Sequence, residues 1–147
     1  MALSLLVAPL FAETSPEAEV QNAVDALWSA ASNLDTDNSF GRSLPNDGGF
    51  YIMDGHVVWT REDTLDLYRE TFGAAGKNEI AMSDERVTML ADDLALYVGA
   101  GSYDMADPAG ASMGNGPMAL TLLLKKVAGE WLLMHAHQSF PSGEQAG

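Results

Sequence analysis

Two apolar segments separated by a two-residue turn set the strongest limit on how this chain folds. Residues 117–127 read PMALTLLLKKV, residues 130–140 read EWLLMHAHQSF, and Ala128-Gly129 lies between them. This arrangement predicts a β-hairpin of two long strands. Leu120–Leu124 is almost continuously apolar, so both faces of that strand should be covered. Helices of the same chain can cover one face, and we expect a homodimer through the sheet to cover the other.

The segments before this hairpin favour two helices and further antiparallel strands. Apolar residues follow Ser15 and Thr60 at helical spacing, and both residues are good N-caps. Two short strands are predicted around an Asp54-Gly55 turn, longer strands over 79–90 and 94–105, and a loop over 107–116. This order predicts an α+β class, with helices packed on one face of a curved antiparallel sheet.

Composition excludes several classes of partner. The 147 residues suit one domain, and the formal net charge of -14 comes from 21 acidic and 7 basic residues. Phosphate backbones and anionic membrane surfaces repel such a chain, so we expect no nucleic acid and no membrane partner. The chain has no cysteine, which rules out disulfides and thiolate metal sites.

The first fourteen residues, MALSLLVAPLFAET, form an apolar segment of the length found in export signals, but no Lys or Arg precedes it. The segment is either the remainder of an export signal or an apolar arm that packs on the domain or on a partner. Localisation therefore stays open between the cytoplasm and export. The expected organisation is this segment over 1–14, one domain over 15–140 and a tail over 141–147.

Several short motifs, taken in order, resemble the SnoaL-like branch of the nuclear transport factor 2-like superfamily. They are Trp28 on the first helix, Asp54-Gly55, Arg61–Asp63, Arg86–Gly99 and Thr121–Ser139. The resemblance implies a cone-shaped fold, in which a strongly bent sheet wraps around the N-terminal helices and leaves a pocket at its wide end. Relatives of this kind include ketosteroid isomerases, polyketide cyclases, dehydratases, epoxide hydrolases and non-catalytic association domains, so the fold alone does not give the reaction.

The polar end of the last strand is a candidate site. His135, His137 and Ser139 alternate, so a regular strand places them on one face, which Trp131 and Leu133 extend. A histidine there can give or take a proton near neutral pH. The resemblance to the family's HQS ending favours His137 as the catalytic residue. Alternatively, both histidines bond buried carbonyl or carboxylate groups and hold the sheet edge.

Asp104, near the end of a central strand, is the candidate catalytic carboxylate, unless it is a loop-start residue that faces water. No metal site is expected, because His135 and His137, two positions apart, lack a convincing third ligand. No cofactor is expected either. No serine has the glycine pattern of a nucleophile elbow. The residues expected to bind substrate are Trp28, Tyr51, Tyr97, Thr121, His135 and Ser139.

Two functions fit these features. The first is binding of a small hydrophobic metabolite in a conical pocket, with cofactor-free proton transfer of the isomerase, dehydratase or cyclase type. The second is a non-catalytic module that dimerises or binds a ligand or a protein. The polar end of an apolar strand favours the first, whereas the acidic surface and the lack of a clear base favour the second.

Overall fold

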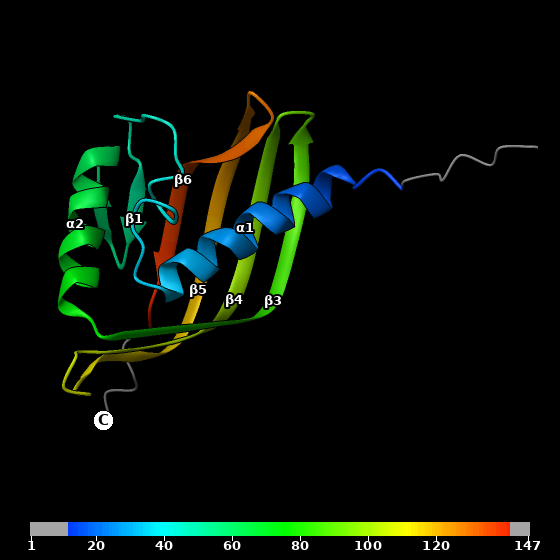
Figure 1. Cartoon of the computed structure of the whole chain (residues 1–147). Coiled ribbons are helices and arrows are strands. Elements are labelled where there is room, and N and C mark those ends of the chain that lie inside the picture. The colour runs from blue at the N-terminus through cyan, green and yellow to red at the C-terminus, as the bar shows by residue number, and fades with distance from the viewer. Residues whose placement is uncertain (1–11, 142–147) are drawn as a thin grey trace, which may run out of the picture.

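The computed structural model of the protein describes residues 12–141, which form two helices and one sheet (Figure 1). The predicted N-terminal segment and tail lie almost entirely outside these residues. The elements are α1 (Pro16–Ser32), β1 (Tyr51–Met53), β2 (His56–Val58), α2 (Arg61–Ala74), β3 (Lys77–Ala91), β4 (Leu94–Ala106), β5 (Ser112–Val127) and β6 (Glu130–Ser139). No helix in the described part of the chain is long and apolar enough to cross a membrane.

Both helices begin at the predicted caps. The Ser15 hydroxyl accepts a hydrogen bond from the Ala18 amide at 3.2 Å, and the Thr60 hydroxyl accepts one from the Asp63 amide at 3.1 Å. These bonds satisfy amides that have no partner within the first helical turn. The apolar stripe of α1 is buried, as its spacing predicts: Val20, Val24, Leu27, Trp28 and Ala31.

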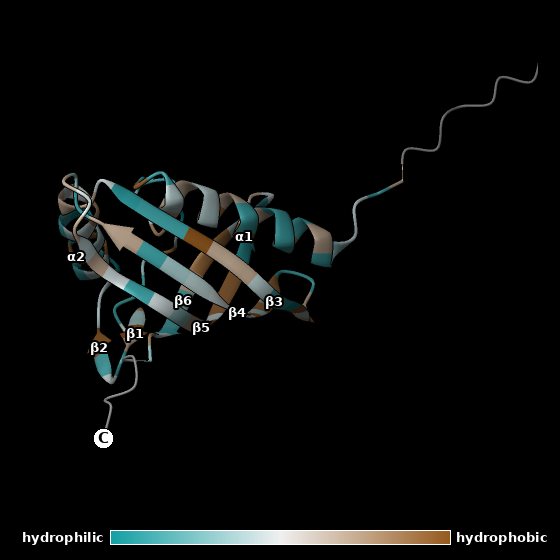
Figure 2. Cartoon of the chain, turned by 90° about the horizontal axis from the view of Figure 1, so that it is seen from below, coloured by the Kyte–Doolittle hydropathy of each residue, from teal (hydrophilic) through white to brown (hydrophobic). Residues whose placement is uncertain are grey.

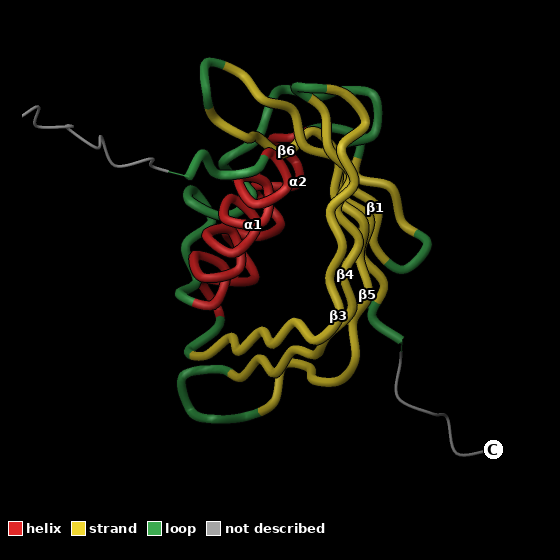
Figure 3. Tube along the Cα trace, turned by 90° about the vertical axis from the view of Figure 1, so that its right-hand side faces the viewer, coloured by secondary structure: helices red, strands yellow, loops and turns green. Residues whose placement is uncertain are grey.

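The six strands form one open, curved sheet in the order β2-β1-β6-β5-β4-β3. All neighbours are antiparallel except β1 and β6, which are parallel, so the sheet is mixed. Figure 1 shows α1 lying across the strands, and Figure 3 shows both helices on the same side of the sheet. Figure 2 shows apolar stretches on the strands that α1 crosses. The predicted α+β class with a bent sheet around the helices is confirmed.

Strand β5 begins earlier than the sequence predicts. Residues 107–116 were expected to form a loop, but β5 starts at Ser112, and Gly116 and Gly114 pair with Tyr103 and Met105 of β4. Gly114 adopts a φ of 148°, a region that residues with side chains rarely occupy. The longer hairpin of β4 and β5 extends the sheet past the end of α1 and carries Tyr103, Met105 and Met113 to the wide end of the fold.

A β-bulge in β6 reverses the predicted orientation of the HAHQS stretch. Leu124 pairs with Leu133 while Leu123 pairs with His135, so Met134 is one extra residue in the strand. The Met134 carbonyl accepts a hydrogen bond from Asn46 Nδ2 at 2.9 Å. Trp131 and Leu133 are buried before the bulge, whereas Ala136 and Gln138 are the buried residues after it. The expected common face of Trp131, Leu133, His135, His137 and Ser139 is therefore wrong.

Candidate functional site

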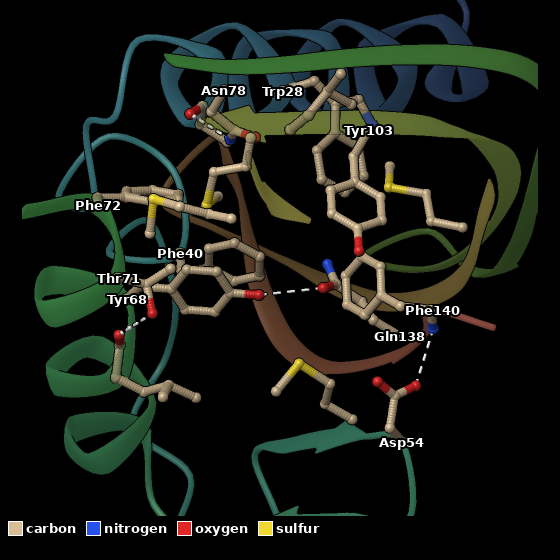
Figure 4. Close-up of a pocket in the computed structure, with 17 residues that line it drawn as sticks. Trp28, Phe40, Asp54, Tyr68, Thr71, Phe72, Asn78, Tyr103, Gln138 and Phe140 are labelled. Carbon is tan, nitrogen blue, oxygen red and sulfur yellow. Dashed lines mark hydrogen bonds between the residues drawn. The ribbon is translucent and has the colours of Figure 1, made fainter. Parts of the chain in front are cut away.

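A cavity of about 310 Å³ lies at the wide end of the fold, between the two helices and the inner face of the sheet (Figure 4). Its volume is at the lower end of the range for small-molecule sites. Most of its wall is apolar, built from aromatic and thioether side chains. The aromatic residues are Trp28, Phe40, Tyr68, Phe72, Tyr103 and Phe140, and the methionines are Met53, Met105, Met113 and Met118.

Gln138 is the most firmly held polar group of the cavity wall. The side chain is only 4% exposed, and its Oε1 atom accepts hydrogen bonds from the hydroxyls of Tyr51 at 2.7 Å and Tyr68 at 3.1 Å. The two tyrosine hydroxyls lie 2.7 Å apart. Because Oε1 is the acceptor, the Nε2 amide must point away from the tyrosines, and it bonds to no residue that the structure describes. Figure 4 shows this nitrogen directed toward the space below Tyr103. Gln138 therefore offers two N–H donors to a ligand.

Burial keeps both tyrosines in their neutral form. Desolvation raises the pKa of Tyr51 well above its ordinary value, and the neighbouring Tyr68 raises it further. Desolvation also raises the pKa of Tyr68. Both hydroxyls therefore remain protonated near neutral pH, and the pair holds the Gln138 amide through hydrogen bonds that do not titrate there.

Aromatic packing fixes the walls on either side of Gln138. Tyr68 stacks on Phe40 with ring centroids 3.9 Å apart and meets Phe72 edge-on at 5.3 Å. Tyr103 meets Phe140 edge-on at 4.9 Å on the opposite side. Such contacts restrict ring rotation. The cavity is therefore bounded by two groups of rings, with the Gln138 amide between them (Figure 4).

Asp54 supplies a carboxylate at the rim of the cavity. It occupies the β1–β2 turn with a φ of 47°, and its Oδ1 atom accepts a hydrogen bond from the Phe140 amide at 2.8 Å. This bond joins the turn to the end of β6. The second oxygen has no partner among the described residues. Asp54 is also the only carboxylate among the described residues that line the cavity, so it is the group best placed to accept a proton there.

Asn78 forms a second polar point, on the side of the cavity nearest α1. This buried side chain donates from Nδ2 to the Ala31 carbonyl at 2.9 Å, which leaves Oδ1 without a partner among the described residues. The cavity thus presents amide donors at Gln138 and an amide acceptor at Asn78. Among the residues that the structure describes, no group of three His, Asp or Glu side chains is arranged to hold a metal ion.

Of the substrate-binding residues predicted from the sequence, Trp28 alone lines the cavity. Tyr51 lies behind the wall, where it holds Gln138. Tyr97 is buried nearby, accepts a 3.4 Å hydrogen bond from Trp28 Nε1 and donates to Glu85 at 2.7 Å, but it does not reach the cavity. The remaining three, Thr121, His135 and Ser139, lie on the outer face of the sheet.

The two predicted catalytic residues also lie away from the cavity. His137 is exposed on the outer face, because the bulge at Met134 turns it away from the helices. Asp104 is half-buried on β4, where the Lys77 ammonium group binds it at 2.7 Å. The structure therefore does not bring His137 and Asp104 together, and a catalytic role for either stays a prediction.

The polar residues that do line the cavity carried weak signals in the sequence. Gln138 sits between His137 and Ser139 and looks like an outward residue in a regular strand, since a bulge leaves no clear mark in the sequence. Tyr68 lies among apolar residues at helical spacing in α2, and this spacing does not indicate that its hydroxyl holds Gln138. Asp54 was recognised as a turn residue, where Asp is common for conformational reasons alone.

Solved structures of low sequence identity share this fold. A ketosteroid isomerase-like protein from Erwinia carotovora atroseptica has 19% identity and a TM-score of 0.70, with 88% of this chain and 99% of that chain covered. A nuclear transport factor 2-like superfamily protein from Salmonella enterica serovar Typhimurium has 12% identity and a TM-score of 0.72, with coverages of 88% and 93%. A candidate calcium/calmodulin-dependent protein kinase II association domain from Xanthomonas campestris has 22% identity and a TM-score of 0.71, with coverages of 92% and 94%.

A comparison with curated proteins finds no match. The model of one protein family, described as the SnoaL-like domain, matches residues 20–143 and so spans most of α1, all of α2 and all six strands. The match covers most of the chain and agrees with the bent sheet and the cavity at its wide end. The chain belongs to the SnoaL-like domain family.

Proposed function

We propose that the protein binds a small, flat, neutral ligand in the cavity, through a hydrogen-bond acceptor on the ligand that faces Gln138. The observation that carries this proposal is the oriented amide: two tyrosine hydroxyls hold Oε1, and Nε2 has no partner among the described residues. No side-chain nitrogen or oxygen of the described residues is both buried and without a partner, so Nε2 is open to the cavity. A ligand carbonyl or hydroxyl can therefore replace water on its N–H donors.

The walls favour the flat shape and the lack of negative charge. Aromatic rings and thioethers accept planar apolar surfaces through stacking and dispersion. No Lys or Arg is among the described residues that line the cavity, while Asp54 lies at its rim. A carboxylate or phosphate on the ligand would therefore lose its hydration without gaining a counter-charge.

Cofactor-free proton transfer is the reaction that best fits these groups. A ketone whose oxygen accepts from Gln138 would have its α-carbon acidified, because the developing enolate oxygen is stabilised by the amide donors. Asp54 would accept the proton and return it to another position, which is an isomerisation. The likeness in fold to a ketosteroid isomerase-like protein is consistent with this proposal.

One observation favours a non-catalytic module instead. The Phe140 amide already bonds Oδ1 of Asp54, so one of the two carboxylate oxygens is engaged in holding the β1–β2 turn to the end of β6. The Xanthomonas structure shows that the same fold is found in a candidate association domain. In that case the cavity would bind a ligand, or only fill space, without chemistry.

Binding of 9-fluorenone and of fluorene, measured by calorimetry, tests the proposal. The two tricyclic probes differ by one carbonyl oxygen. We expect fluorenone to bind about five- to tenfold more tightly, which corresponds to one net hydrogen bond. In Gln138→Glu the tyrosines keep their acceptor but the N–H donors are lost, and the preference for fluorenone should disappear. Equal affinity of the native protein for both probes would contradict the role of Gln138.

A further inference from the structure

We infer that the ligand of this cavity carries a second polar group, an O–H or N–H donor, which binds Oδ1 of Asn78 on the side nearest α1. The inference deepens the proposed function and rests on it, because both concern the same cavity. Figure 4 shows Asn78 and Gln138 well apart, on different sides of the space. Asn78 thereby determines specificity, and the ligand is a planar apolar molecule with an acceptor at one end and a donor at the other.

The orientation of the Asn78 amide follows from its partner at the end of α1. The carbonyl of Ala31 belongs to the last turn of the helix, where carbonyl groups have no partner within the helix. It accepts hydrogen bonds from the Leu34 amide at 3.0 Å and from Asn78 Nδ2 at 2.9 Å. A carbonyl oxygen can only accept, so the side chain must present its NH₂ group to Ala31. The other branch of the amide, Oδ1, therefore points away from the helix end.

Oδ1 of Asn78 is an acceptor that is open to the cavity. The residue is only 6% exposed, and Oδ1 accepts no hydrogen bond from the residues that the structure describes. No side-chain nitrogen or oxygen of these residues is both buried and without a partner, so Oδ1 keeps access to the cavity that Asn78 lines. A donor on a ligand can therefore replace water at this oxygen.

The electrostatic potential at this side of the cavity also favours a donor. The C-terminal end of a helix carries a partial negative charge, and the last turn of α1 contains no basic residue that would offset it. Ala31 and Trp28 bring this end of α1 to the cavity wall. No Lys or Arg is among the described residues of the wall. The positively polarised hydrogen of an O–H or N–H group is therefore attracted to this side, whereas a second acceptor would be repelled.

The position of the two amides in the sheet sets the length of the ligand. Asn78 is on β3 and Gln138 is on β6, with β4 and β5 between these strands. Three spacings between strands correspond to roughly 14 Å between the two backbones across the sheet. The intervening strands contribute Met105 and Met118 to the cavity wall, so the space between the amides is apolar. A ligand that reaches both amides therefore needs an apolar body longer than a single ring.

Calorimetry with matched pairs of tricyclic ketones tests for the second polar contact. The probes are 2-, 3- and 4-hydroxy-9-fluorenone, and each is compared with the fluorofluorenone that carries fluorine at the same position. Fluorine occupies nearly the same space as a hydroxyl group but donates no hydrogen bond. At about pH 6.5 the phenolic hydroxyl stays protonated, so no charge enters the cavity. We expect the hydroxyl compound of at least one pair to bind about five- to tenfold more tightly, which corresponds to one net hydrogen bond.

Two substitutions of Asn78 assign the contact to its oxygen. Asn78→Leu keeps the branched shape but removes both polar atoms, and the Ala31 carbonyl keeps its bond from the Leu34 amide. The preference for the hydroxyl compound should disappear in this variant. Asn78→Asp keeps an acceptor oxygen, and the preference should persist. Asn115→Leu is the matched control, because Asn115 is exposed on β5 and is not among the residues that line the cavity, and it should bind all the probes as the native protein does.

The same probes separate this inference from the proposed function. The preference for fluorenone over fluorene depends on Gln138 and should be unchanged in Asn78→Leu, whereas the preference for a hydroxyl over a fluorine should be unchanged in Gln138→Glu. Equal affinities within all three pairs, with fluorenone still preferred over fluorene, would overturn the inference and leave the proposed function intact. A hydroxyl preference that survives in Asn78→Leu would overturn it as well. Equal affinity for fluorenone and fluorene would instead contradict the proposed role of Gln138.

Discussion

The hydroxyl of Tyr51 donates a 2.7 Å hydrogen bond to Oε1 of Gln138, although the two residues are 87 positions apart in the chain. The parallel pairing of β1 with β6 makes this contact, with Met53 aligned to Gln138. The bond holds the amide in one orientation, and the orientation determines which atom faces the cavity. The polar chemistry of the proposed site therefore depends on the side-chain contact between these two strands.

Tyr51→Phe should reduce the free energy of unfolding by about 1 kcal/mol, because a buried hydrogen bond is lost while Tyr68 still holds Oε1. The amide then has more freedom, and fluorenone should bind about threefold more weakly. Tyr97→Phe is the control: Tyr97 is equally buried, and its hydroxyl bonds Glu85 and Trp28 but not Gln138. Chemical denaturation and calorimetry should show a loss of stability in both variants and a loss of affinity in Tyr51→Phe alone.

Asp54→Asn should abolish proton transfer and preserve the fold. The Asn oxygen can still accept from the Phe140 amide, so the link between the turn and β6 remains. With 2-tetralone in deuterated buffer, proton NMR should show α-proton exchange slower by about 100-fold or more than with the native protein. Asp104→Asn removes a carboxylate that is bound to Lys77 outside the cavity, and the exchange rate should not change. A native protein that does not accelerate exchange would leave ligand binding as the function.

Acid should destabilise the protein partly through Glu19. Hydrogen bonds from Lys126 and then Trp131, together with the Lys126 charge, lower the pKa of Glu19 below 4.5 in the folded state. A group whose pKa is lowered by folding stabilises the fold at pH values above its unfolded pKa, and this contribution is lost as the pH falls through the folded value. Unfolding of Glu19→Gln should therefore depend less on pH between about pH 5 and pH 3 than unfolding of the native chain. Glu17→Gln, in the same helical turn, is the control.

Neighbouring leucines of β5 should differ in their contribution to stability. Leu122 is fully buried on the inner face, and Leu122→Ala should cost about 2–5 kcal/mol through lost burial and a cavity. Leu123 points outward and pairs with His135, so Leu123→Ala should cost less than about 1.5 kcal/mol. Thermal melts of the two single variants measure this difference. Similar losses in both variants would indicate that the outer face is buried within the monomer.

Local signals in the sequence were enough to predict the helices, the hairpin and the fold class. Ser15 and Thr60 cap their helices through bonds that involve neighbouring residues only. The turn at Ala128-Gly129 is also local, with Ala128 at a φ of 50°. The start of β5 at Ser112 was not predicted, because its glycines are typical of loops and only their pairing with β4 makes them a strand.

The site could not be predicted in the same way. Gln138 reaches the cavity because of a bulge at Met134 that depends on contacts with distant segments, including the bond from Asn46. The cavity also combines α1, α2 and five of the strands, so no short motif contains it. Alternation in the sequence predicts one face for Trp131, Leu133 and the residues at 135, 137 and 139, and this assignment fails after the bulge.

The bulge in β6 determines which side chains of its last residues face the inside of the fold, and related chains could differ at this point. Without it, the strand would continue in regular alternation, and the stretch from His135 to Ser139 would turn over as a unit. Two imidazoles and a hydroxyl would then face the inner side of the sheet, and the Gln138 amide would move to the outer surface. One set of side chains therefore encodes two alternative interiors, an amide-lined one and an imidazole-lined one. A shift of pairing by one residue is enough to exchange them without any change in amino-acid composition.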